Sequence, residues 1–275
     1  MARPRAGHLV PLVVAVGLVA TGCGNGFEGT GAAPVTLVVS ESWVAGHQGV
    51  GGGGGAAGGS EVQARIGSLQ HAIDALRKVT RTGWTGRQDD VTGYLSELTG
   101  GSWSGEPDAF MDAYGTALFG VDSSALILGE PDGQTVPGIV TTKATQAVGG
   151  IPVLDAALVF VARDARLTGV RGRVFPGLTV STIPTFPAEQ ARAVAEEASS
   201  GVAQEPPSLV VLPRDSGVLA WLVTVAAASD GTTPLAGARY YIDAAGGDIL
   251  SVQPISAEGR VALPWTGPAL SLIHI

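Results

Sequence analysis

Apolar side chains recur at helical spacing in three stretches of the chain. In 60–79 they follow one another at intervals of three and four residues, which predicts a helix with Ser60 as its N-cap. A second helix is predicted over 108–119, after a proline and before a glycine. A third is predicted over 188–198, where alanines dominate the apolar face and would let the helix lie close to a sheet.

Elsewhere the apolar positions alternate or form short runs, as is typical of strands. The strands predicted in this way cover 35–39, 126–128, 139–148, 153–162, 167–175, 209–212, 218–227, 238–244 and 248–252. The last two would form a hairpin across Ala245, Gly246 and Gly247, and Asp132-Gly133 is predicted to be a turn. The sequence therefore predicts an α+β fold, with helices packed on curled antiparallel sheets.

Two glycine-rich stretches interrupt these patterns. Residues 49–59 are almost pure glycine, which maximises backbone entropy, so we expect a disordered tether and a fold that begins near Ser60. The stretch 101–105 is predicted to be a loop, because Trp103 stands where a nucleophile elbow would need serine.

The N-terminus has the pattern of a targeting segment. Arg3 and Arg5 precede an apolar run that ends at Ala20 and is too short to span a bilayer. The next residues lead directly to Cys23, the only cysteine, in a sequence that resembles the lipobox of bacterial lipoproteins. We expect a signal peptide over 1–22, a lipid on Cys23 and a protein at the outer face of the cell membrane, with a secreted protein as the alternative.

The acidic net charge of the chain disfavours one class of partner. The formal net charge is −8, and removing the two arginines of residues 1–22 leaves 14 basic against 24 acidic residues, or −10. A surface this acidic repels phosphate backbones, so we expect no nucleic-acid partner.

Few residues are suited to catalysis. The four histidines are His8, His47, His71 and His274, and no pair stands at i and i+4, so the chain has no H-E-x-x-H zinc motif. His71 lies off the apolar stripe of its helix and is expected to be a solvated surface residue. We therefore expect no catalytic residue, no metal and no cofactor in this chain. The stretch 263–267 matches the L-P-x-T-G pattern of sortase substrates, and we interpret it as a linker.

Residues 108–252 resemble the pro-region of thermolysin- and fungalysin-type metalloproteases, in which a fungalysin/thermolysin propeptide motif precedes a PepSY-like domain. Three of the segments that carry the resemblance are a helix end, a turn of the form Q-x-x-x-G-[IV]-P-V, and a closing hairpin, which in the family usually has a Tyr/Val-Asp-Ala-x-x-Gly pattern. The strand pair over 158–173 follows the turn and also fits the family. The residues that match these segments are Phe119 and Gly120, then Gln146, Gly150, Ile151, Pro152 and Val153, and finally Tyr241, Asp243 and Gly247.

The resemblance implies two consecutive cystatin-like or PepSY-like subdomains, over 60–182 and 183–256, between a tether (23–59) and a tail (257–275). In that family the pro-region is an intramolecular chaperone and inhibitor of its protease, in cis or in trans. Zinc is expected only in a catalytic domain outside this chain. Trp221, Tyr240 and Tyr241 are the candidate contacts for the protease, because large aromatics commonly anchor interfaces; burial in the core is their alternative role. The alternative function is a stand-alone lipoprotein that acts as a cell-surface binding module without a protease partner.

Overall fold

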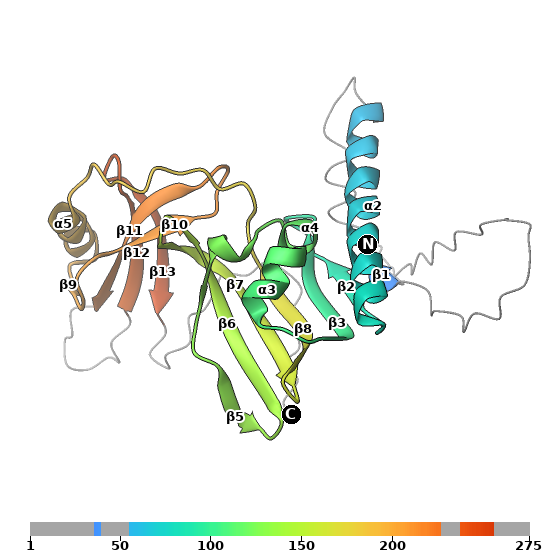
Figure 1. Cartoon of the computed structure of the whole chain (residues 1–275). Helices are drawn as coiled ribbons and strands as arrows, with labels where there is room; N and C mark the ends of the chain where they lie inside the picture. Colours follow the sequence, from blue (N-terminus) through green and yellow to red (C-terminus); the bar gives the residue numbers. More distant parts are fainter. Residues whose placement is uncertain (1–35, 40–54, 227–236, 256–275) are drawn as a thin grey trace, which may run out of the picture. The chain divides into compact units, whose positions relative to one another are not determined.

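The computed structural model describes residues 36–39, 55–226 and 237–255, and it shows an α+β chain dominated by open, curled sheet (Figure 1). Two compact units divide the chain. Unit 1 comprises the described residues up to Ala144 together with Ala157–Pro176, and unit 2 comprises Thr145–Ala156 and the described residues from Gly177 on. The predicted signal peptide, Cys23 and the tail over 257–275 lie outside the described residues.

Unit 1 contains the longer helix and most of the strands. Helix α2 (Gly55–Thr80) is followed by a second helical segment in three pieces: α3 (Pro107–Phe110), a π-helical turn (Met111–Gly115) and α4 (Thr116–Leu118). The strands are β1 (Thr36–Val38), β2 (Thr85–Gln88), β3 (Leu95–Trp103), β4 (Leu126–Leu128), β5 (Asp132–Val136), β6 (Ile139–Val148), β7 (Ile151–Arg163) and β8 (Arg166–Arg173). They run in the order β1-β2-β3-β8-β7-β6, with β4 and β5 both paired to β6; β6 and β7 continue into unit 2.

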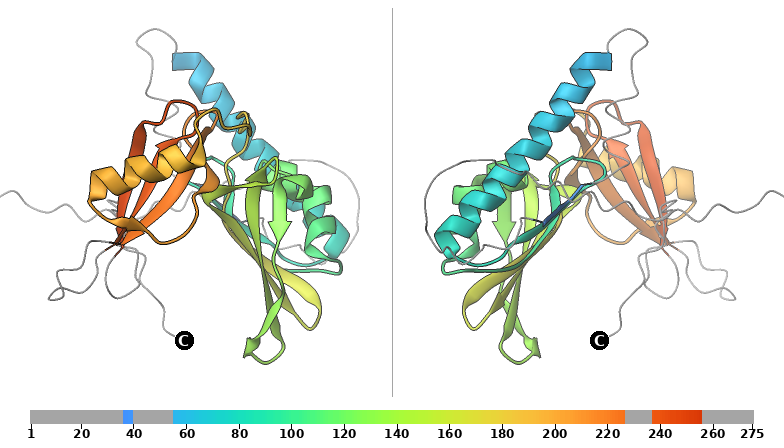
Figure 2. Two further views of the ribbon diagram at one scale, coloured as in Figure 1. Left: turned by 90° about the vertical axis from the view of Figure 1, so that its left-hand side faces the viewer. Right: turned by 90° about the vertical axis from the view of Figure 1, so that its right-hand side faces the viewer.

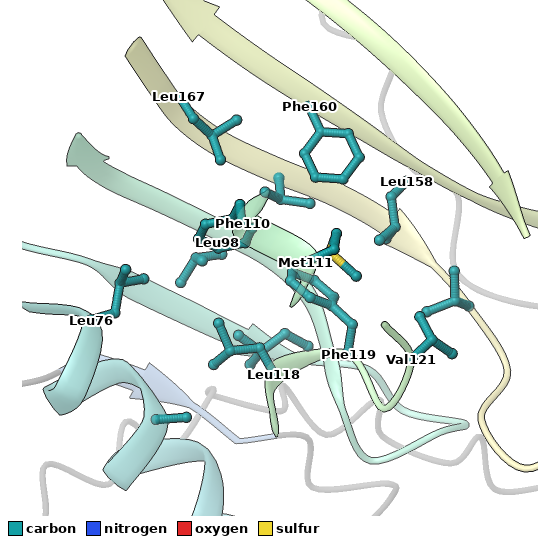
Figure 3. Close-up of a cluster of buried hydrophobic side chains, with 14 of the residues drawn as sticks. Leu76, Leu98, Phe110, Met111, Leu118, Phe119, Val121, Leu158, Phe160 and Leu167 are labelled. Carbon is teal, nitrogen blue, oxygen red and sulfur yellow. The ribbon is translucent and has the colours of Figure 1, made fainter. Parts of the chain in front are cut away.

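The core of unit 1 lies between its helices and one face of its sheet (Figure 3). Leu76 of α2 and Phe110 and Leu118 of the second helical segment are fully buried there. Leu98 of β3 and Phe160 of β7 face them from the sheet. The helical spacing and the strand alternation in the sequence thus meet in one apolar layer, whose burial supplies the main stabilising term of this unit.

Unit 2 is a smaller sheet covered by one helix. After α5 (Ala188–Ser199) come β9 (Val202–Ala203), β10 (Ser208–Leu212), β11 (Val218–Ala226), β12 (Gly237–Asp243) and β13 (Ile249–Ile255). The strand order is β7-β10-β11-β12-β13, antiparallel from β10 onward, with β9 beside β11. Helix α5 packs on β11 and β12 (Figure 2), and its alanines Ala191 and Ala195 are fully buried against Val223 and Ile242. This confirms the close helix–sheet packing that the small residues predict.

The main error of the sequence-based prediction concerns the start of the first helix. Helix α2 begins at Gly55, so residues 55–59 are helical and Ser60 lies inside the helix, where it is not an N-cap. Ala56 and Ala57 favour the helix, and the long segment after Ser60 already meets the cost of nucleation. The helix can therefore extend through Gly58 and Gly59 although glycine has a low helix propensity. Residues 49–54 lie outside the described part of the chain.

Two predictions about loops are also wrong. Asp132 begins β5, so Asp132-Gly133 is part of a strand. Gly101 and Trp103 belong to β3, where Trp103 pairs with Leu167 of β8. The indole of Trp84 lies across this glycine, since a Cβ on Gly101 would lie 1.8 Å from Trp84 Cε2. A glycine in a strand can mark such a close approach by an aromatic ring, which composition alone does not reveal. Within the described ranges, no helix has the length and apolarity needed to cross a membrane.

Candidate functional site

Acidic residues and histidines do not gather into a metal site in the described part of the chain. No group of three or more His, Cys, Asp or Glu residues is close enough there to hold an ion. His71 is exposed on α2, as its position off the apolar stripe predicts. The residues that carry the family resemblance are the remaining candidates for a functional site.

The first motif turn joins β6 to β7. Gln146 is 3% exposed, and Gly150 at the turn has φ +83°, a left-handed conformation that favours glycine. Ile151 and the exposed Pro152 begin β7, where the missing N–H of proline is tolerated. Val153 is buried and pairs with β10 in parallel register. Each residue type thus fits a backbone or packing requirement of the turn.

The second motif turn closes the β12–β13 hairpin. The Asp243 carboxylate accepts a hydrogen bond from the Ala245 N–H (3.0 Å). The backbone of Asp243 adds two bonds, because its N–H donates to Asp248 O (2.8 Å) and its carbonyl accepts from the Gly247 N–H (2.9 Å). Gly247 has φ +84°, and a Cβ there would lie 2.5 Å from the ring of Phe186. Aspartate and glycine are therefore required by local geometry.

Residues 177–187 form a strap that connects both motif turns. Its side chains alternate between exposed and half-buried, and the half-buried ones are Leu178, Val180, Thr182, Pro184 and Phe186. The strap meets a glycine of positive φ in each of three turns: Gly149 beside Thr182, Gly217 beside Val180 and Gly247 beside Phe186.

Backbone hydrogen bonds fix the strap to two of these turns. The Thr179 N–H donates to Ser216 O (2.7 Å), and the N–H groups of Thr185 and Phe186 both donate to Ala244 O (2.9 and 2.8 Å). The indole N–H of Trp221 also donates to Phe186 O (2.8 Å). One extended segment of unit 2 therefore holds the ends of several of its strands together.

The third motif segment lies in unit 1. Phe119 is fully buried, and Gly120 ends α4 with φ +78°, its N–H donating to Gly115 O (3.0 Å). A Cβ on Gly120 would lie 2.8 Å from the Tyr94 ring and from Pro176. This glycine is the left-handed residue that commonly ends helices.

The three aromatic residues predicted as protease contacts pack in or against the core of unit 2. Tyr240 is 8% exposed on the face that α5 covers, and Tyr241 is 1% exposed on the opposite face. Burial raises the pKa of the Tyr241 hydroxyl, with a smaller opposing effect of Arg239 and a smaller raising effect of Asp155, and this hydroxyl donates to Gln253 Oε1 (2.9 Å). Trp221 is half-buried. In this fold the two tyrosines offer no surface to a partner, which favours the alternative role in the core.

A buried carboxylate in unit 1 was missed in the sequence. Asp89 is 4% exposed; its Oδ1 accepts from the N–H groups of Val91 (2.9 Å) and Thr92 (2.8 Å), and its Oδ2 pairs with Arg173 Nε (2.7 Å). The Nη2 atom of Arg173 pairs with Asp90 Oδ1 (2.8 Å). The aspartates and the glycine of Asp89-Asp90-Val91-Thr92-Gly93 are typical of a turn, but nothing in the pattern points to an arginine 84 residues away.

Comparison with known proteins adds a distant structural likeness. No protein-family model matches the chain, and no curated protein matches it in sequence. Among solved structures, the Bacillus megaterium YpeB C-terminal domain is similar over 70% of this chain and 96% of that domain, with 12% identity and a TM-score of 0.31. A likeness of this size carries no functional inference, so the resemblance to protease pro-regions stays a prediction.

Proposed function

We propose that this chain is an exported, lipid-anchored pro-region that binds a thermolysin-like zinc metalloprotease, in cis or in trans. It assists the folding of the protease domain and inhibits it, while the chain itself carries no catalytic residue. Cys23 holds it at the outer face of the cell membrane. Any zinc belongs to the protease domain.

The observation that supports the proposal is the position of the motif residues in the backbone turns and in the sheet. Gly150 and Gly247 stand at positive φ, Asp243 caps its own turn, and Val153 is buried in the sheet. Each of these residue types thus meets a requirement of its local backbone or packing, as the matching residues of a related fold would. The segments around Gln146 and Tyr241 also fall in one compact unit, although 95 positions separate them (241 − 146).

Inhibition by such a module follows from recognition by a preformed surface. A rigid sheet loses little conformational entropy on docking, so more of its contact energy appears as affinity. The residue best placed to contribute is Ile183, which is 77% exposed on the strap between the two motif turns. An exposed branched side chain on a fixed backbone is suited to enter a pocket of a partner.

The test uses the mature chain, residues 23–275, with Cys23→Ser so that it is not lipidated. We expect it to slow hydrolysis of a peptide by a purified thermolysin-like protease and to raise the yield of active protease on refolding. Ile183→Asp should weaken inhibition by about tenfold or more, as loss of an interface anchor does. The matched control is Val202→Asp, which changes another exposed apolar residue of unit 2, 62% exposed, away from the strap.

Two results would count against the proposal. If the chain fails to slow any thermolysin-like enzyme or to assist its refolding, the stand-alone cell-surface binding module becomes the better assignment. If inhibition is present but Ile183→Asp and Val202→Asp behave alike, the protease contact lies elsewhere than on the strap. Thermal melting of each variant separates loss of a contact from loss of the fold.

A further inference from the structure

The β5–β6 hairpin of unit 1 ends in an uncharged apolar tip. Residues 136–140 read Val-Pro-Gly-Ile-Val, and Val136 and Val140 are 44% and 38% exposed. The tip extends beyond the helices of the same unit (Figures 1 and 2), and none of its residues belongs to the buried core cluster of that unit. The nearest acid on the hairpin's first strand, Asp132, lies at the other end of β5.

A second hairpin tip lies beside the first and carries positive charge. The turn from β7 to β8 reads Arg163-Asp164-Ala165-Arg166, and all four residues are exposed. Asp164 and Ala165 have φ of 51° and 58°, as a tight hairpin turn requires. The Asp164 N–H donates to Gly138 O at 3.3 Å, which joins the two tips. Two arginines against one aspartate give this end of unit 1 a local charge of +1, in a chain of net charge −8.

The chain connection between Cys23 and unit 1 is short. Strand β1 begins at Thr36 and is paired with β2 in parallel register, so 12 residues (24–35) lie between the lipidated cysteine and the sheet. The 13 Cα-to-Cα steps from Cys23 to Thr36 span at most about 47 Å. From β1 to β5 the sheet has six strand steps, or about 29 Å at 4.8 Å per step. A lipid on Cys23 therefore keeps the tip within reach of the bilayer surface.

We propose that the β5–β6 tip inserts into the interfacial layer of the membrane that carries the lipid anchor, with Arg163 and Arg166 at the level of anionic headgroups. Apolar residues at a hairpin tip are suited to the boundary between headgroups and acyl chains, and neighbouring cations add attraction to anionic lipid. The short connection raises the local concentration of membrane, so a weak insertion suffices to orient unit 1. The inference rests on the lipid anchor of the proposed function.

The first experiment measures binding without the lipid. The mature Cys23→Ser chain is mixed with vesicles of phosphatidylcholine and phosphatidylglycerol and floated on a density gradient. We expect co-flotation that falls about tenfold or more for Val136→Asp/Val140→Asp, because two inserted apolar side chains become charged. The matched control is Val91→Asp/Val202→Asp, which changes two valines that are more exposed, 57% and 62%, one in the turn from β2 to β3 and one in β9, and neither of which belongs to the two hairpins. This control should float like the parent chain.

The second experiment reports insertion at one residue. Cys23 is the only cysteine, so the Cys23→Ser chain has no thiol, and a cysteine introduced at one position is its single labelling site. An environment-sensitive dye on Val136→Cys should shift to the blue when vesicles are added, and the same dye on Val91→Cys, in the turn from β2 to β3, should not. Replacing Arg163 and Arg166 by glutamine should weaken binding to anionic vesicles and leave binding to pure phosphatidylcholine unchanged.

Three outcomes would overturn the inference: no co-flotation of the parent chain, equal flotation of tip and control variants, or a tip label that responds to self-association in sedimentation while ignoring vesicles. The last would assign the tip to a contact between two copies. None of these measurements involves the protease or the lipid on Cys23. A failed insertion is thus distinguishable from a failed proposal of inhibition or of lipidation.

Discussion

Gly247 lies directly against the ring of Phe186, so that a Cβ on this glycine would lie 2.5 Å from the ring carbon Cε2. The residue also has φ +84°, a conformation that strains any side chain. We expect Gly247→Ala to lower the free energy of unfolding by about 2 kcal/mol, measured by urea denaturation. Gly246→Ala is the control, since its nearest neighbour is the Asp243 carboxylate oxygen at 3.3 Å. Equal losses for the two variants would show that the ring contact is unimportant.

The pair of Asp89 and Arg173 offers a second test of stability. Asp89→Ala removes the carboxylate that lies 2.7 Å from Arg173 Nε, and it removes the side-chain acceptor of the Val91 and Thr92 N–H groups. We expect Asp89→Ala to cost about 3 kcal/mol of unfolding free energy, as breaking a buried pair does. Asp90→Ala, whose side chain is 54% exposed, should cost less than about 1 kcal/mol. A larger loss for Asp90→Ala would refute the assignment.

Acid should weaken unit 2 at the end of α5. The Glu196 carboxylate accepts from the Ala203 N–H (2.9 Å) and then from Arg192, and these bonds lower its pKa from the ordinary 4.5. Because the folded pKa is the lower one, the stabilisation is present above the unfolded value and is lost as the pH falls through the folded value. Glu196→Gln should therefore lower the melting temperature at pH 7 and make little difference at pH values well below 4.5. Glu197→Gln is the control, and a pH-independent effect of Glu196→Gln would contradict the expectation.

Lipidation at Cys23 is tested by fractionation. Cys23→Ala should move the protein from the membrane pellet to the soluble fraction, because the acyl chains provide most of the membrane affinity. A signal peptide cleaved without lipidation would leave the parent chain soluble as well. A Cys23→Ala protein that still sediments with membranes in the presence of high salt would rule out the cysteine as the anchor.

The sequence was sufficient for elements whose apolar pattern is strong. Strand β6 and helix α5 were predicted to within one residue, because one alternates cleanly and the other has a small-residue face. Strand β3 was missed, since its glycines and serines give no alternation, and Gly101 is explained by the indole of Trp84 that lies across it. The reason for a glycine in this strand is Trp84, a residue outside the strand, so the pattern within the strand does not reveal it.

The candidate site shows the same division. Turn residues such as Gly150 and Asp243 could be found, because left-handed and turn-capping positions restrict residue type locally. The strap could not, because its alternation looks like a broken strand between prolines and its contacts lie in turns distant along the chain. Tyr240 and Tyr241 could not be assigned either, since consecutive strand residues face opposite sides, and here both sides are covered.

The contacts of the strap have a consequence for how unit 2 opens. The N–H groups of Thr179, Thr185 and Phe186 donate to carbonyls in two different turns, so none of the three can be released without detaching the same extended segment. In native-state hydrogen exchange, amides that open together share one free energy of opening and one dependence on denaturant. The three amides should therefore exchange as a single cooperative group, and a change that loosens one turn, such as Gly247→Ala, should speed the exchange of Thr179 at the far end of the segment.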